Sequence, residues 1–214
     1  MTRAGLFLSF EGGEASGKSI QALRLVASLR DRGVDAVLVR EPGGTTAGER
    51  IREILLHARD VSLTPEAQAL LFMAARAQLV REVVRPALAR GSAVVADRYF
   101  DSTLAYQGFA GGADLDGLRD LVRFAVGDAL PDRTFLLDVP VDVVLARSRA
   151  RAADRPWDRF EARERVFHER LREGYLRLAA ADPRRFVIVP GDRDEAEIAR
   201  EILRHVEALL ATPA

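Results

Sequence analysis

The sequence has 214 residues, 48% of them hydrophobic and 30% charged, which fits a single domain, 1–214, with one core. Its 32 basic and 32 acidic residues balance, so its charge indicates neither a nucleic acid nor an acidic membrane as a partner. The absence of cysteine excludes disulfides, thiolate catalysis and cysteine-bound metals, and no apolar run is long enough for a membrane span or a signal peptide, so we expect a cytoplasmic protein.

Short apolar runs alternate with amphipathic stretches along the chain. We predict strands at 6–10, 36–40, 93–97, 134–138 and 186–189. Helices are expected at 18–32, 47–58, 65–90 with room for a kink at Pro86, 115–126, 141–149, after the Arg-rich stretch 147–159 as far as about 180, and 194–210. Apolar strands that alternate with helices indicate a parallel sheet covered on both faces. The predicted fold is therefore α/β, of the P-loop NTPase type, with three αβα layers around a five-stranded parallel sheet.

A glycine-rich segment joins the first strand to the first helix. Residues 12–19, GGEASGKS, match the pattern G-x-x-x-x-G-K-[ST] of phosphate-binding loops. Glycines let backbone N–H groups face the phosphates, and the helix that follows contributes its positive end. Lys18, the one lysine of the sequence, is expected to reach the β- and γ-phosphates of ATP, and Ser19 to bind Mg²⁺. The predicted ATP-binding residues of this loop are Gly12, Gly13, Glu14, Ala15, Ser16, Gly17, Lys18 and Ser19.

A phosphate-binding loop does not distinguish a GTPase or a motor from a small kinase, so the rest of the chain must decide. Asp97 ends the third predicted strand, where an acidic residue can hold the Mg²⁺ shell; the alternative is a plain turn at the end of a strand. We expect 102–108, STLAYQG, to be a polar loop at the end of the sheet where ligands bind in α/β folds.

Five segments resemble the thymidylate kinase family, and together they span nearly the whole chain. They are FEGGEASGKS at 10–19, REPGGT at 40–45, LFMAARAQ at 71–78, DRYFDSTLAYQG at 97–108 and DRFE at 158–161. The resemblance implies a nucleoside monophosphate kinase that uses ATP and Mg²⁺ to phosphorylate dTMP to dTDP, for dTTP biosynthesis. It also implies a homodimer, although burial in the monomer core explains the apolar face of helix 65–90 equally well.

The resemblance implies roles for residues of the acceptor pocket. Phe72 would stack on thymine, and Arg76 would bind a base carbonyl. Arg98 would bind the acceptor phosphate, Tyr106 would exclude a ribose 2′-hydroxyl, and Glu14 would meet the 3′-hydroxyl or the phosphate region. The implied dTMP-binding residues are Glu14, Glu41, Arg52, Phe72, Arg76, Arg98, Thr103, Tyr106 and Gln107. Without the resemblance, a phenylalanine on a helix is more often part of the core.

An Arg-rich stretch at about 147–160 contains Pro156 and fits either a solvated basic face or a mobile lid that closes over ATP. Cationic groups near the transferred phosphoryl group lower the barrier to its transfer. The phosphate-binding loop has Ala15 where some family members carry an arginine, so this chain resembles the members with arginines in the lid. Arg147 would stack on adenine. The expected catalytic residues are Glu14, Lys18, Arg98, Arg151 and Arg155.

Two other functions stay open. The first is a kinase for a different small acceptor, such as a deoxynucleoside or another monophosphate; the pocket residues argue against it, namely Phe72, Arg76, Thr103 and Tyr106. The second is a P-loop switch or regulatory ATPase, which would need an attacking-water residue and loops that order on the γ-phosphate. We find no such motif in the sequence. Slow ATP hydrolysis that does not depend on an acceptor would favour the switch.

Overall fold

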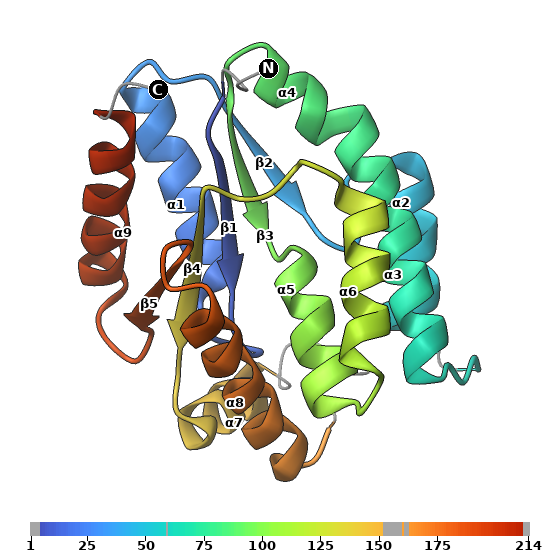
Figure 1. Ribbon diagram of the computed structural model, residues 1–214. Helices are drawn as coiled ribbons and strands as arrows, with labels where there is room; N and C mark the ends of the chain where they lie inside the picture. Colours follow the sequence, from blue (N-terminus) through green and yellow to red (C-terminus); the bar gives the residue numbers. More distant parts are fainter. Residues whose placement is uncertain (1–4, 59, 152–159, 161–162, 212–214) are drawn as a thin grey trace.

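The computed structural model describes residues 5–58, 60–151, 160 and 163–211, and for Arg151 only the backbone (Figure 1). Most of the expected lid at 147–160 therefore lies outside the described residues. So do Arg155 and the side chain of Arg151, which were the predicted catalytic arginines of that lid.

All strands predicted from the sequence are present. They are β1 (Phe7–Glu11), β2 (Ala36–Arg40), β3 (Ala93–Asp97), β4 (Arg133–Asp138) and β5 (Phe186–Pro190). They form one parallel sheet in the order β2-β3-β1-β4-β5. β1 is thus central, with Phe10 opposite Asp97 of β3 on one side and Phe135 of β4 on the other. The direction of the crossovers changes beside β1, the place where α/β sheets bind ligands.

Helices connect the strands. The α-helices are α1 (Lys18–Asp31), α2 (Thr46–Arg52), α3 (Pro65–Leu79), α4 (Arg85–Ala89), α5 (Phe100–Thr103), α6 (Leu115–Val126), α7 (Val141–Arg151), α8 (Arg165–Ala181) and α9 (Glu195–Leu210). Wider, π-helical segments extend three of them: Glu53–His57 after α2, Val80–Val84 after α3, and Leu104–Ala110 after α5. Within the described residues, no helix has the length and apolar character that crossing a membrane requires.

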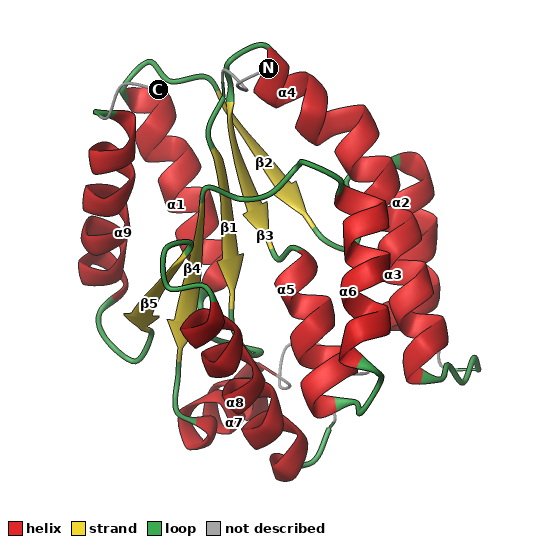
Figure 2. Ribbon diagram, viewed as in Figure 1, coloured by secondary structure: helices red, strands yellow, loops and turns green. Residues whose placement is uncertain are grey.

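The helices cover both faces of the sheet (Figures 1 and 2). Side chains alternate along a strand, so Leu8 and Phe10 of β1 pack in one core cluster with α1 and α9. Phe7 points the other way, into a cluster with α3, α4, α5 and α6. A third cluster joins α8 and segment Leu104–Ala110 to Leu136 of β4. The predicted three-layer αβα fold is confirmed.

The prediction of a loop at 102–108 was wrong, because this part of the chain is helical. It belongs to α5 and to the π-helical segment Leu104–Ala110. Burial of Leu104 on one core cluster and of Tyr106 on another outweighs the turn tendency of its glycine. A Cβ at Gly108 would lie 2.4 Å from Leu115 Cδ2, so this glycine lets the segment approach α6.

The expected helix at 65–90 is a continuous helical stretch from Pro65 to Ala89. The π-helical turn Val80–Val84 lies just before Pro86. A proline cannot donate to the carbonyl four residues earlier, and its ring crowds that carbonyl. The π-helical turn therefore lies where a regular α-helix would lose that hydrogen bond and place the proline ring against the carbonyl.

Candidate active site

A cavity of about 300 Å³ opens where the carboxyl ends of β1 and β3 meet the start of α1. Predicted residues that line it are Glu14, Ala15, Ser16, Gly17, Lys18, Ser19, Glu41, Arg52, Phe72, Arg76, Asp97, Arg98, Thr103, Tyr106 and Gln107. Gly12 and Gly13 instead line a much smaller cavity beside β4. Arg147 lies at the edge of the phosphate-binding loop, where it donates to the carbonyls of Ala15, at 3.4 Å, and of Gly191, at 3.1 Å.

The phosphate-binding loop depends on backbone conformations that favour glycine. Gly12 has φ 138°, and a Cβ there would lie 2.6 Å from the carbonyl oxygen of Leu137. Gly17, at φ 95°, is the N-cap of α1. The first residues of α1 line the cavity, so the N–H groups at the start of the helix are available to an anion bound there. Ala15 also has a positive φ, 51°, which an alanine seldom adopts. The loop is therefore shaped to present backbone N–H groups to an anion.

Lys18 lies folded against this loop. Its Nζ donates to the Gly13 carbonyl at 2.6 Å and contacts Ser16 Oγ at 3.1 Å. Burial and the nearby Arg98 guanidinium lower the pKa of Lys18 to about 8, and Glu14 opposes this. A phosphate would favour the ammonium form and offer it better acceptors.

Two oxygen groups converge beside the loop. Ser19 Oγ donates to Asp97 Oδ2 at 2.5 Å, because Asp97 ends the strand next to β1. Among the described residues no three histidine or acidic side chains cluster as a metal site. Mg²⁺ usually binds through one or two protein oxygens together with water and substrate phosphates, so this pair fits an ion held jointly with ATP.

Arg98 occupies the centre of the site. Its guanidinium donates to Glu14 Oε1 at 2.7 Å and to Tyr106 Oη at 3.0 Å, and lies over the Tyr106 ring. Tyr106 Oη also donates to Glu14, at 2.5 Å. Burial alone would raise the pKa of Glu14, but Arg98 and then Lys18 lower it to about 2. Glu14 and Arg98 are therefore a charged pair in the wall of the cavity.

Arg76 is buried in the wall beside Phe72, one turn earlier on α3. Its Nε donates to Glu41 Oε2 at 2.6 Å, one terminal nitrogen donates to Thr103 Oγ1 at 3.1 Å, and the other donates to the Tyr99 carbonyl at 3.1 Å. Burial raises the pKa of Glu41, and Arg76 opposes the shift. These contacts fix the guanidinium plane.

The resemblance implies that Arg76 donates a hydrogen bond to a base carbonyl, but most of its donors already have partners. Besides the contacts to oxygen, one terminal nitrogen meets Met73 Sδ at 3.5 Å. Thioether sulfur is a weak acceptor. A base carbonyl would most easily take the place of that sulfur contact.

Further residues line the cavity although the sequence did not mark them as site residues. They are Ile20, Arg40, Pro42, Leu56, Ser102 and Phe160. Four of them stand inside the segments that resemble the family and could have been found there: Arg40, Pro42, Ser102 and Phe160. Tyr175 of α8 reaches Arg98 at 3.4 Å across 77 positions of sequence, and no local signal indicates that contact.

The fold and the site define the class of this protein. A phosphate-binding loop after β1, an acidic residue at the end of β3 and the side chains of α3 that line the same cavity are the parts of a P-loop nucleotide kinase. A family model described as thymidylate kinase matches residues 10–202. The chain belongs to the thymidylate kinase family and is a phosphotransferase.

Similar proteins agree over nearly the full length. A thymidylate kinase of Clavibacter michiganensis subsp. michiganensis is 46% identical over 210 residues, 98% of each chain. That of Thermomicrobium roseum is 51% identical over 183 residues, 86% of this chain and 85% of the relative. The crystal structure of thymidylate kinase from Ehrlichia chaffeensis superposes with a TM-score of 0.76 at 29% identity, covering 95% of this chain and 98% of the other.

Proposed function

We propose that this protein transfers the γ-phosphoryl group of ATP to the phosphate of dTMP and forms dTDP and ADP. One observation carries the proposal: the phosphate-binding loop and the pocket around Phe72 line a single cavity, with Arg98 in its wall. Two nucleotides bound there would meet with their phosphates near Arg98. Such alignment converts a reaction between two molecules into one within a complex.

The acceptor needs no general base. A phosphate monoester has a second pKa of about 6, so the attacking oxygen is mostly ionised at neutral pH. Arg98 would hold that phosphate, and Lys18 would leave its carbonyl partner for the β- and γ-phosphates of ATP. Mg²⁺, held by Ser19 and Asp97 together with ATP, would neutralise phosphate charge. Arg151 and Arg155 remain predicted sources of further positive charge.

The sugar pocket favours a deoxyribose. Tyr106 is held by Glu14 and lies under the Arg98 guanidinium, so its ring has little freedom to move aside for a 2′-hydroxyl. Phe72 is half buried, with its ring centroid 6.2 Å from that of Phe160, and would offer a flat surface to thymine. A homodimer and a cytoplasmic location remain predictions.

The test is a coupled assay of ADP release with MgATP and a panel of acceptors: dTMP, dUMP, dCMP, dGMP, UMP and AMP. We expect dTMP to give the highest kcat/KM, with UMP far below dUMP because of Tyr106. ADP release at one rate with every acceptor, or without any, would contradict the proposal and favour an ATPase.

A further inference from the structure

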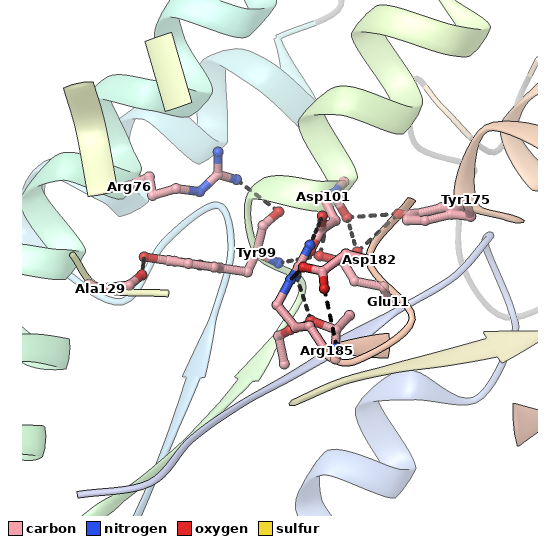
Figure 3. Close-up of polar contacts among 11 residues, drawn as sticks. Glu11, Arg76, Tyr99, Asp101, Ala129, Tyr175, Asp182 and Arg185 are labelled. Carbon is pink, nitrogen blue, oxygen red and sulfur yellow. Dashed lines mark hydrogen bonds and ion pairs between the residues drawn. The ribbon is translucent and has the colours of Figure 1, made fainter. Parts of the chain in front are cut away.

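Glu11 is a fully buried carboxylate behind the site. It ends β1 and is absent from the lining of the cavity, so it cannot reach a substrate. Figure 3 shows it at the centre of a polar network. Its Oε1 accepts from the backbone N–H groups of Tyr99, at 2.8 Å, and of Ser102, at 3.3 Å. Its Oε2 accepts from Ser102 Oγ, at 2.6 Å, and from Tyr175 Oη, at 3.0 Å.

The two hydroxyl groups connect Glu11 to Arg98. A hydroxyl group has one hydrogen to donate, and an ionised carboxylate only accepts. When Ser102 and Tyr175 give their hydrogens to Glu11, their oxygens remain as acceptors. One terminal nitrogen of Arg98 lies within hydrogen-bonding distance of both oxygens, at 3.2 Å from Ser102 Oγ and 3.4 Å from Tyr175 Oη, and it also donates to the Gly12 carbonyl at 3.1 Å.

The backbone at Arg98 is held from the same side. Arg98 has φ 71°, in the left-handed region that residues with side chains seldom adopt. Its own N–H donates to the Phe10 carbonyl at 3.0 Å, and the next N–H, that of Tyr99, donates to Glu11. The end of β1 therefore fixes both N–H groups of the unusual turn.

We propose that Glu11 is a positioning residue for phosphoryl transfer, whose carboxylate holds the backbone and the guanidinium of Arg98 in the orientation that binds the acceptor phosphate. The inference rests on the proposed role of Arg98. Among the described hydrogen bonds, Glu11 is linked to Arg98 through Tyr99, Ser102 and Tyr175.

A neighbouring carboxylate provides the matched control. Asp101 is also fully buried, but it accepts two hydrogen bonds from Arg185, at 2.6 and 2.9 Å, in the turn before β5. Figure 3 shows Asp101 beside Arg185, and these described side-chain hydrogen bonds of Asp101 do not involve Arg98. Asp101→Asn thus removes a buried charge from the same network without changing the hydroxyl groups that face Arg98.

The test compares Glu11→Gln and Asp101→Asn with the parent in the full-length protein. An amide nitrogen at position 11 would donate where two hydroxyl groups also donate, so the acceptors for Arg98 would be disturbed. We expect Glu11→Gln to weaken dTMP binding by calorimetry at least tenfold and to raise the KM for dTMP similarly. Thymidine, which lacks the phosphate, should bind within about twofold of the parent, as should ATP. Asp101→Asn should keep its dTMP affinity within about threefold.

Two results would overturn the inference: dTMP affinity in Glu11→Gln within twofold of the parent, or an equal loss in Asp101→Asn. If Glu11→Gln does not fold, Ser102→Ala and Tyr175→Phe decide, since each removes one link. Each should weaken dTMP binding at least threefold, and no change in both would contradict the proposal. A parent that does not bind dTMP would instead refute the proposed function, so the two failures are distinguishable.

Discussion

At the scale of single residues, the site contains a carboxylate whose useful form is the one that burial disfavours. Burial and the nearby Asp101 raise the pKa of Glu11 to about 7, and its hydrogen bonds to Ser102 and Tyr99 only partly offset this. The ionised form is nevertheless the one that accepts both hydroxyl hydrogens and leaves their oxygens to Arg98. The ionised form of Glu11 that orients Arg98 is therefore the form that destabilises the folded protein.

This opposition has a measurable consequence. The pKa of Glu11 is about 7 in the folded protein and 4.5 in an unfolded chain, so between these values the folded state keeps a proton that the unfolded state has lost. The free energy of unfolding should then decrease as pH rises from about 4.5 to 7, by about 3 kcal/mol at most from this group. Urea unfolding of the parent and of Glu11→Gln at pH 5 and pH 8 measures the contribution.

Glutamine does not titrate, so the variant should lose less stability than the parent between the two pH values. Other titrating groups are common to both proteins, and those that do not interact with Glu11 cancel in the comparison. An identical pH dependence in the two proteins would show that Glu11 is ionised throughout.

The parts of the site that could be predicted from the sequence are those formed by residues close together in the chain. The phosphate-binding loop, residues 12–19, is one continuous motif, and its chemistry follows from glycine conformation and a helix start. The contacts of Glu11 with Tyr99 and Tyr175 span 88 and 164 positions of sequence. Only the order of strands in the sheet and the packing of α8 bring them together, and neither can be read from spacing.

At the scale of helices and strands, α8 and segment Leu104–Ala110 approach closely at Gly174. A Cβ added there would lie 2.5 Å from Phe109 Cβ. Alanine favours a helix over glycine by about 1 kcal/mol, but overpacking costs about 1–3 kcal/mol. We therefore expect Gly174→Ala to destabilise the protein by about 1 kcal/mol in urea unfolding.

The control is Arg170→Ala, at an exposed position of the same helix. It should change stability by less than about 0.5 kcal/mol. If Gly174→Ala is as stable as this control, the two segments have room to separate and the close approach does not limit stability.

Every strand was predictable because the strands are short, apolar and separated by helices. The helical character of 100–110 was not, since Gly108, Gly111 and Gly112 suggest turns. Tertiary burial decides this segment: Leu104, Ala105 and Tyr106 are buried against two different core clusters. Local sequence has no information about a neighbour such as α8.

At the scale of the whole molecule, the two halves of the cavity belong to opposite faces of the sheet. Lys18 begins α1 on one face, and Phe72 lies in α3 on the other (Figure 2). Each nucleotide should therefore stabilise the protein independently. A ligand at 100 times its Kd adds about 2.7 kcal/mol, or roughly 5–10 °C in Tm for a chain of this size.

Thermal unfolding of two variants tests this division. Lys18→Ala should lose the Tm increase caused by ATP and keep the one caused by dTMP. Phe72→Ala should show the reverse. Loss of both increases in both variants would mean that the halves of the cavity do not bind separately.

The left-handed backbone at Arg98 has a consequence for changing this protein by design. Glycine adopts φ 71° without strain, so a search that scores only backbone strain would select it at this position. The same change would delete the guanidinium proposed to hold the acceptor. It would also leave the Glu14 carboxylate in the cavity wall without its cation, so the relief of backbone strain would be offset by the loss of the ion pair, and glycine would serve neither stability nor catalysis here.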